Sequence, residues 1–385
     1  MNNRTLTMLA VGDLILGKPE AESYFALAAP VLRAADVVVG QLEVLFTKRV
    51  VNAYYVEIPT EIPALPGFDP SNMSALPFAG FNVLTLAGNH VWDAGVPGIE
   101  DSIAGLRNYG IAVVGAGMNI DEARSPVVIE RNGTRFGFLD YNCVGPKVSW
   151  ATPDKPGCAY VNVITHYELD HPTPGGDYPL IYTFAEPRSL GAMVHDIHKL
   201  RPLCDVLVVA FHKGIGFTPI KIGMYEQQVS YAAIDAGADL ILAHHAHILK
   251  GIEQYKGKTI FHGLGNFVVA MPPAVLAEYT WAFQQWGKRM EEIFGGYNKP
   301  DPEYPGYPWH PETAQTIISK CTVDRGKISG VSYLPCLINK QGQPEILKND
   351  KRGRQVFNYM DKITKAAGLN ARYEWEGDEI VIHSE

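Results

Sequence analysis

The sequence feature that most constrains the fold is an apolar run that ends in a cluster of histidines. Residues 239–247 read Asp-Leu-Ile-Leu-Ala-His-His-Ala-His, without a charged side chain between Asp239 and His244. Such a run is typical of a strand buried on both faces of a parallel sheet, and ligands bind beyond the carboxyl ends of such strands. His244, His245 and His247 therefore lie where a binding site is expected. Three histidines in four positions favour metal binding over ordinary burial of polar groups.

Histidines one and two positions apart can point at one ligand only if the chain leaves extended geometry, because successive side chains of a strand face opposite sides. We expect this change of backbone direction directly after Ala243. The predicted strand end and the predicted metal site therefore occupy the same place in the chain.

Polar residues follow the ends of several other predicted strands. Short apolar runs predict strands at residues 7–11, 36–40, 81–87, 206–211, 240–243 and 259–262. Helical spacing of apolar residues predicts helices between them, near residues 20–35, 93–109, 187–200 and 225–236. The polar side chains that follow these strands are Asp13, Glu43, Asn89, His212, His245 and Asn266. The alternation of strands and helices is typical of an α/β protein. Because a polar residue follows each of these strands, we expect the six side chains to share one edge of the sheet system, which we call the rim.

The turn Gly88-Asn89-His90 follows the predicted strand at 81–87. A glycine at this point lets the backbone turn sharply. The turn therefore delivers an amide oxygen and an imidazole together at the predicted rim.

Two antiparallel pairs are also predicted. Asn132-Gly133 between two apolar runs is a strong hairpin signal. Residues 316–323 and 327–334 predict a second pair around Asp324-Arg325-Gly326. Both pairs add strands to the sheet system without a crossover helix.

The chain is expected to form one continuous domain. Residues 1–348 make up its main part, and residues 142–180 and 271–315 lack any period and are interpreted as insertions near the site. The second insertion is rich in aromatic residues, which favours either a cover over the site or ordinary packing on the sheet. Residues 349–385 predict a helix and a strand packed on the main part.

Composition and charge exclude several classes of protein. The formal net charge is −8, and no cluster of Lys and Arg is present, which argues against nucleic-acid binding. No segment approaches the roughly 18 apolar residues of a membrane span, and the first ten residues lack an export signal. The five cysteines have no CxxC pair and are interpreted as reduced thiols. We therefore expect a cytoplasmic protein that binds neither nucleic acid nor membrane.

Taken together, these motifs resemble the CapA-like family, which is associated with poly-γ-glutamate capsule synthesis and looks like a branch of the calcineurin-like metallophosphoesterases. The resemblance covers roughly residues 6–348 in motif order and spacing. It depends on six motifs: Gly12-Asp13, Gln41-Leu42-Glu43, Gly88-Asn89-His90, His212-Lys213-Gly214, His244-His245-Ala246-His247 and Gly263-Leu264-Gly265-Asn266-Phe267. The fold that it implies is a four-layered α/β/β/α sandwich with two facing mixed sheets.

The resemblance also implies roles for individual residues. His90 matches the outer-shell histidine that assists the leaving group and is the expected catalytic residue. Apart from the resemblance, Lys213, His244 and Asn266 are expected to contact the substrate. The expected metal ligands are Asp13, Glu43, Asn89, His212, His245 and His247.

The chain departs from the phosphoesterase pattern at several positions. Ile15 stands where a histidine usually follows the first aspartate, which removes one ligand. Glu43 replaces an aspartate as the bridging group, and Ala243 and His244 stand where a glycine is usual. Lys213 replaces the aromatic residue that CapA-like proteins tend to carry.

Nitrogen and oxygen ligands without thiolate suit Mn, Zn or Fe, as one or two divalent ions. Such ions lower the pKa of water and polarise a carbonyl or phosphoryl oxygen. The predicted function is therefore a metal-dependent hydrolase that acts on a small or short peptide-like substrate. An amide or γ-glutamyl-type bond is favoured, because the 271–315 insertion has no Arg cluster for a phosphate and Lys213 is a candidate partner for a carboxylate. The alternatives are a phosphoesterase, a capsule biosynthesis component, and a metal-assisted isomerase or epimerase.

Overall fold

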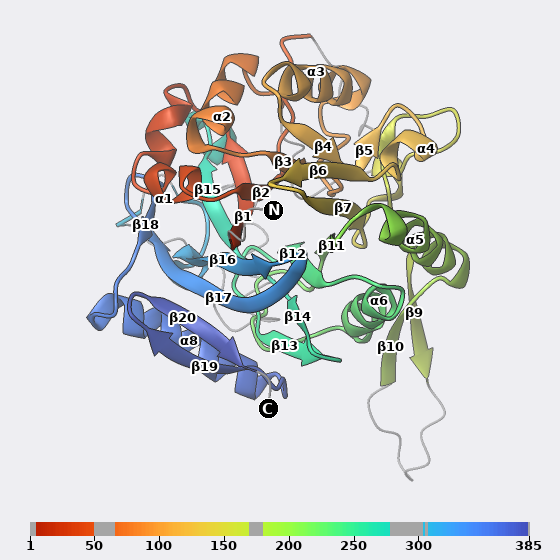
Figure 1. The fold of residues 1–385 in the computed structure, drawn as a ribbon. Coiled ribbons are helices and arrows are strands. Elements are labelled where there is room, and N and C mark those ends of the chain that lie inside the picture. Colours follow the sequence, from red (N-terminus) through yellow and green to blue (C-terminus); the bar gives the residue numbers. More distant parts are fainter. Residues whose placement is uncertain (1–4, 50–65, 169–179, 278–302, 305–306, 384–385) are drawn as a thin grey trace, which may run out of the picture.

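A ten-stranded mixed sheet forms one half of the core of the protein (Figure 1). The computed structural model describes residues 5–49, 66–168, 180–277, 303–304 and 307–383. The order of strands along this sheet is β19-β20-β17-β16-β1-β2-β3-β4, with β15 also paired to β1 and β18 to β17. Its strands are β1 (Leu6–Leu16), β2 (Val37–Leu42), β3 (Val83–Thr85), β4 (Ala112–Val114), β15 (Asn266–Ala270), β16 (Gln315–Asp324), β17 (Lys327–Ile338), β18 (Pro344–Ile346), β19 (Arg372–Glu376) and β20 (Glu379–His383).

A six-stranded mixed sheet forms the other half, in the order β13-β14-β12-β11-β7-β6. Strands β7, β11, β12 and β14 are parallel, whereas β6 and β13 are antiparallel to their neighbours. The strands are β6 (Val127–Arg131), β7 (Thr134–Asn142), β11 (Val206–Lys213), β12 (Leu240–His245), β13 (Ile252–Tyr255) and β14 (Lys258–Phe261). Two small ribbons stand apart from both sheets: β5 (Ala116–Gly117) with β8 (Gly157–Cys158), and β9 (Val163–Glu168) with β10 (Leu180–Ala185).

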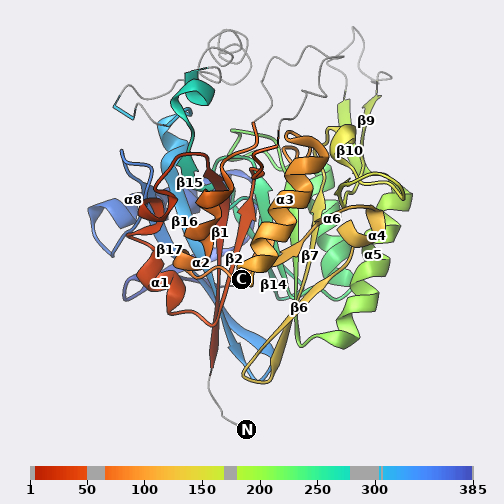
Figure 2. The same ribbon diagram turned by 90° about the horizontal axis from the view of Figure 1, so that it is seen from above.

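Helices cover the outer faces of the two sheets, except α8, which packs against the hydrophobic cluster between them. In Figure 1, α5 and α6 lie on the opposite side of the sheets from α1 and α2, and Figure 2 shows the same arrangement from above. The helices are α1 (Ala29–Arg33), α2 (Ala75–Ala79), α3 (Gly95–Asn108), α4 (Ile120–Ala123), α5 (Pro187–Leu200), α6 (Met224–Asp235) and α8 (Lys351–Ala366). Short 3-10 turns lie at η1 (Ala21–Phe25), η2 (Pro70–Ser74), η3 (Lys147–Ser149), η4 (Arg201–Leu203) and η5 (Pro311–Ala314).

Three hydrophobic clusters fill the spaces between these layers. One joins α1–α3 to the ten-stranded sheet, and a second joins α5 and α6 to the six-stranded sheet. The third lies between the sheets, where Val39 of β2 and Val208 of β11 belong to the same buried cluster. This order of helix, sheet, sheet and helix confirms the predicted four-layered α/β/β/α sandwich.

The local predictions mostly hold, and the clearest exception is one helix. Asn132 and Gly133 both have positive φ, 49° and 81°, as the predicted two-residue hairpin turn requires. The single helix predicted for residues 20–35 is wrong, because the chain forms η1 and then the separate helix α1. Pro30 lies in the first turn of α1, where its missing N–H costs nothing, whereas inside a continuous helix it would remove a hydrogen bond.

The two predicted insertions are only partly within the described residues. Residues 169–179, 278–302 and 305–306 lie outside them, and with them most of the aromatic side chains of the second insertion. The C-terminal segment extends the ten-stranded sheet, because β20 pairs with β17. No helix among the described residues is both long and apolar enough to cross a membrane.

Candidate metal centre

We expected strand β1 to end before Asp13, but it continues through this residue to Leu16. At Asp13, β1 changes its partner from β16 to β15, and Asp13 pairs with Asn266. Gly12 permits the change, because a Cβ there would lie only 2.0 Å from the carbonyl oxygen of Gly265. The backbone N–H of Asp13 donates to that same oxygen at 3.0 Å. The close approach of β15 places Asp13 and Asn266 side by side.

Three side chains from distant parts of the chain form a buried cluster, which we call the acidic group: Asp13, Glu43 and His247. One potential ligand atom of each lies within 4.8 Å of the others. Nε2 of His247 is 3.3 Å from Oε1 of Glu43, and Nδ1 is 3.7 Å from Oδ2 of Asp13. Asp13 is supplied by β1, Glu43 by the residue after β2, and His247 by the turn after β12.

Burial and mutual repulsion dominate the electrostatics of the acidic group. Desolvation and the charge of Glu43 raise the pKa of Asp13 well above its usual value. Burial alone would raise the pKa of Glu43, but the charge and hydrogen bond of His247, together with the charges of His90 and His245, outweigh it and lower that pKa. Burial likewise opposes the charge on His247, yet Glu43 and Asp13 raise the pKa of His247 to about 9. A protonated His247 therefore compensates the carboxylates when no cation does.

Three further side chains form what we call the imidazole group: Asn89, His212 and His245. Oδ1 of Asn89 is 2.6 Å from Nε2 of His212, which is 3.2 Å from Nδ1 of His245. Burial, together with the neighbouring imidazoles, lowers the pKa of His212 well below its usual value and that of His245 to about 3. Both imidazoles are therefore neutral near pH 7 and keep a lone pair for a metal.

The backbone around the histidines leaves extended geometry, as the sequence analysis expected, but later than predicted. Strand β12 continues to His245, where φ is 89°, and His247 also has a positive φ of 53°. Positive φ is uncommon for residues other than glycine, and such strain concentrates at functional sites. The N–H of His245 donates to Oδ2 of Asp13 at 3.2 Å, which joins the imidazole group to the acidic group.

His90 lies beside the acidic group and is held by Asp93. Nδ1 of His90 is 2.7 Å from Oδ2 of Asp93, and Nε2 is 3.9 Å from Oε1 of Glu43. Burial opposes a charge on His90, but the charge and hydrogen bond of Asp93 outweigh it, so the pKa of His90 is raised. The contact with Asp93 leaves Nε2 facing the acidic group, where it can give a proton.

Asn266 holds His247 and does not face open space as a substrate contact would. Its Oδ1 is 2.9 Å from Nδ1 of His247, and its Nδ2 donates to the carbonyl oxygen of His247 at 3.1 Å. The same Nδ2 donates at 3.0 Å to the hydroxyl of Tyr307, and the indole of Trp309 stacks on His247 with 4.6 Å between ring centroids. Among the described aromatic residues of the second insertion, Trp309 therefore packs on His247 of the acidic group, and Tyr307 contacts Asn266 behind it.

Lys213 and His244 also lie where the predicted substrate roles do not fit. Lys213 is fully buried on the helix side of β11, where its ammonium donates to the backbone oxygen of Glu226 at 2.6 Å and to Oγ of Ser230. Nε2 of His244 is buried 3.2 Å from the carbonyl oxygen of Val11. Both residues belong to the packing around the site.

Three residues that the sequence analysis did not assign contribute to the site region. Asp93 orients His90, and its i,i+3 spacing in a turn was the available signal. Asp140 accepts from the N–H of Ala87 at 2.7 Å, directly before the Gly88 turn. Gln41 is fully buried beside this turn, and its Nε2 has no hydrogen-bond partner among the described residues. No spacing rule connects Asp140 or Gln41 to the turn.

The donor set fits a divalent cation. Oδ1 of Asp13 and Oε2 of Glu43 are buried and have no hydrogen-bond partner among the described residues, which is costly unless something neutralises them. The two groups offer carboxylate, amide and imidazole donors without thiolate, the mixture that suits Mn, Zn or Fe. Ile15, which stands where a phosphoesterase usually has a histidine, is buried in the hydrophobic core and offers no ligand.

Comparisons with known proteins agree with the motif pattern. The chain is 28% identical over 269 residues to the "PGA biosynthesis protein CapA" of Bacillus subtilis (strain 168), covering 67% of this chain and 62% of the relative. It is 29% identical over 277 residues to the "Capsule biosynthesis protein CapA" of Bacillus anthracis, covering 69% of this chain and 60% of that relative. The matches thus span about three fifths of these relatives.

Among solved structures, a hypothetical protein from Thermus thermophilus is similar with a TM-score of 0.44 and 14% identity, covering 86% of this chain and 98% of that one. A likeness of this size supports no argument about function. The family model described as "Bacterial capsule synthesis protein PGA_cap" matches residues 7–271, which include every residue of the acidic and imidazole groups. The chain therefore belongs to the bacterial capsule synthesis protein family PGA_cap.

Proposed function

We propose that the protein is a metal-dependent hydrolase that uses a metal-activated water. The observation that carries this proposal is the convergence of Asp13, Glu43 and His247 within 4.8 Å, with carboxylate oxygens that no hydrogen bond satisfies among the described residues. Two buried carboxylates side by side repel one another, and this repulsion destabilises the fold. A cation held between them removes that cost.

The residues divide the chemistry between them. The acidic group would hold one ion, and the imidazole group would hold a second where two bind. An ion in these sites supplies Lewis acidity, which lowers the pKa of water and polarises the oxygen of the substrate. His90, oriented by Asp93, gives a proton to the leaving group, a role that contributes about 10²–10⁴-fold in other enzymes.

An amide of the γ-glutamyl type is the proposed substrate bond. Two observations support it. No arginine side chain among the described residues contacts the acidic or imidazole group, so a phosphate would lack the bidentate clamp that it usually has. The relatives are named for capsule and PGA biosynthesis, and a glutamate polymer is joined by amide bonds. A small or short peptide-like amide, handled in the cytoplasm, is therefore the proposed partner.

The five described cysteines support the cytoplasmic location, because all are buried free thiols. Family membership favours a second candidate, participation in capsule assembly. Cell fractionation separates the two: a protein found wholly in the cytosol of a strain without the polymer contradicts the capsule role, and a protein associated with the envelope contradicts the cytoplasmic hydrolase.

The central experiment is a substrate screen with the purified protein and added Mn or Zn. Its panel contains γ-glutamyl amides, phosphodiesters and phosphomonoesters. We expect cleavage of a γ-glutamyl amide that is lost in His245→Ala and kept in His198→Ala, since His198 is an exposed imidazole of α5 away from the site. Cleavage of phosphoesters alone contradicts the amide assignment. Deuterium uptake from D₂O without cleavage, measured by mass spectrometry, indicates an isomerase instead.

A further inference from the structure

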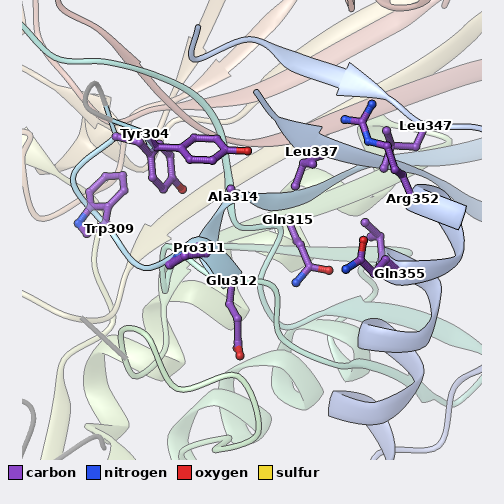
Figure 3. Close-up of a pocket in the computed structure, with 12 residues that line it drawn as sticks. Tyr304, Trp309, Pro311, Glu312, Ala314, Gln315, Leu337, Leu347, Arg352 and Gln355 are labelled. Atoms are coloured by element: carbon purple, nitrogen blue, oxygen red, sulfur yellow. The ribbon is translucent and has the colours of Figure 1, made fainter. Parts of the chain in front are cut away.

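A cavity of about 280 Å³ lies beside the metal centre, between the segment that leads into β16 and helix α8 (Figure 3). Its residues come from three separate stretches of the described chain. They are Tyr304, Tyr307, Trp309, Pro311, Glu312, Ala314 and Gln315 from the first, Leu337 and Leu347 from the second, and Arg352, Gln355 and Val356 from α8. The volume is close to the lower end of small-molecule sites, about 300 Å³.

The inner surface of this cavity is apolar and rigid. Tyr307, Trp309, Ala314, Leu347 and Val356 are each at most 5% exposed, so packing fixes their positions. Aromatic rings and aliphatic side chains together form a floor for a flat or extended ligand.

Two primary amides face the cavity above this floor. Figure 3 shows the side chains of Gln315, from the start of β16, and Gln355, from α8, pointing toward one another. Gln315 is half-buried and Gln355 is exposed, and neither amide makes a side-chain hydrogen bond with another described residue. Each offers two N–H donors and one carbonyl acceptor. An amide group placed between them would find both a donor and an acceptor.

The charged residues at the rim are already paired. The Arg352 guanidinium contacts Glu345, and Glu312 accepts a hydrogen bond from the Tyr359 hydroxyl at 3.3 Å. Arg352 is the one cation among the described residues that line the cavity. Arg352 is half exposed and its guanidinium carries five N–H donors, so donors remain for one carboxylate at the rim.

The cavity shares a wall with the acidic group. Tyr307 accepts from Asn266, which holds Nδ1 of His247, and the ring of Trp309 stacks on His247 at 4.6 Å. A ligand that packs on Tyr307 and Trp309 acts on the same two side chains that position His247. Ligand binding and metal binding are therefore physically connected.

We propose that this cavity is an accessory site for a short amide ligand with a free carboxylate, and that its occupation changes the metal affinity of the acidic group. Gln315 and Gln355 pair with the amide, and Arg352 with the carboxylate. The proposal rests on the proposed function only in its choice of a γ-glutamyl ligand. The site is separate from the groups that would cleave such a bond.

The test uses metal-free protein, so that it does not depend on catalysis. The probe is γ-L-glutamyl-L-glutamate, titrated calorimetrically into the EDTA-treated protein. We expect binding at one site, weakened at least tenfold in Gln355→Leu and unchanged in Lys362→Leu, an exposed α8 position outside the cavity. No binding by the wild type, or equal binding by Gln355→Leu, overturns the proposal.

The connection to the metal is measured by titrating Mn²⁺ with and without saturating probe. We expect a change of threefold or more in Mn²⁺ affinity in the wild type, and by reciprocity the same change in probe affinity with Mn²⁺. An unchanged Mn²⁺ affinity overturns the coupling. Probe binding that requires Mn²⁺ and disappears in His245→Ala places the probe at the metal centre and overturns the accessory site. If the protein hydrolyses none of the substrates, the proposed function is contradicted, but the binding measurements still test the accessory site.

Discussion

Nδ1 of His247 lies 2.9 Å from Oδ1 of Asn266, while the opposite ring nitrogen of His247 lies 3.3 Å from Oε1 of Glu43. Asn266 therefore holds the ring by one nitrogen and directs the other into the acidic group. Outer contacts of this kind fix both the orientation and the tautomer of a metal-binding histidine.

Replacing Asn266 with alanine should weaken metal binding without removing a ligand. We expect a loss of about 10–100-fold in Mn²⁺ or Zn²⁺ affinity, the usual cost of losing such a contact. Asn266→Asp keeps an oxygen acceptor for His247 and should retain most of the affinity. Calorimetric metal titration of both variants decides this, and equal affinity in Asn266→Ala and wild type would mean that the contact does not position the ring.

The variants Asp13→Asn and His245→Ala should lose bound metal and activity but keep the fold. An asparagine at position 13 can still accept from the N–H of His245, and it removes both the buried charge and the repulsion with Glu43, the two causes that raise the pKa of Asp13. The melting temperature of the metal-free Asp13→Asn variant should therefore equal or exceed that of metal-free wild type. Elemental analysis measures the metal content, and unchanged content in both variants would refute the ligand assignment.

Metal binding should release a proton from His247. Burial opposes the charged ring, but Glu43 and Asp13 raise its pKa to about 9 from an ordinary value of 6.5. Because a metal needs the neutral imidazole, we expect the apparent affinity to rise by about tenfold per pH unit between roughly pH 6.5 and 8.5. Calorimetry in buffers of different ionisation enthalpy counts the protons, and a pH-independent affinity would contradict the assignment.

The same pKa shift should affect the stability of the metal-free protein. The folded pKa of His247 is raised, so its stabilising contribution is fully present below pH 6.5 and is lost as the pH rises through about 9. Urea denaturation of metal-free wild type at pH 6 and pH 9 measures this loss, with His247→Gln as the control that should lack it.

His90→Ala should lower turnover by about 10²–10⁴-fold while metal content stays unchanged, because His90 contributes a proton and not a ligand. Asp93→Asn removes the charge that raises the pKa of His90. The pKa of His90 should therefore fall, and the loss of activity on the alkaline side of the pH–kcat profile should begin at lower pH in Asp93→Asn. A profile identical to that of wild type would exclude His90 as the general acid.

Lys213→Met should leave metal content and turnover within about twofold of the wild-type values, since a buried group that faces away from the site touches neither metal nor substrate. The ammonium of Lys213 is directed into the layer beneath α6, where burial lowers its pKa to about 8. A loss of substrate affinity in this variant, measured as a rise in KM, would restore the substrate role that the sequence suggested for it.

Many strands and helices could be predicted from apolar runs and their polar ends, and the four layers from the family resemblance, but some local structure could not. The apolar run before His244 forms strand β12, and the helix predicted at 187–200 is α5. The partner exchange of β1 at Asp13 depends on β15 approaching Gly12, a contact between segments that lie far apart in the chain. No local pattern reports such a contact.

For the site, residue types were more predictable than side-chain directions. The turn residues Asn89 and His90 lie beside the acidic and imidazole groups, as their place after a strand indicated. Lys213 could have been excluded, because β11 is still extended there and alternation places it on the face opposite to His212. Asn266 could not have been excluded as a substrate contact in this way, because its contact with His247 depends on the bend that follows β12.

Strand β1 is bonded on one side to β2 and on the other to both β15 and β16. During synthesis, a ribosome must therefore release residues up to 324 before the N-terminal strand acquires its last neighbour. Until then, the first strand presents an open edge of unpaired backbone N–H and C=O groups to other nascent chains. Chaperone binding to the emerging N-terminal half is the expected consequence, and truncation before β16 should yield an insoluble product.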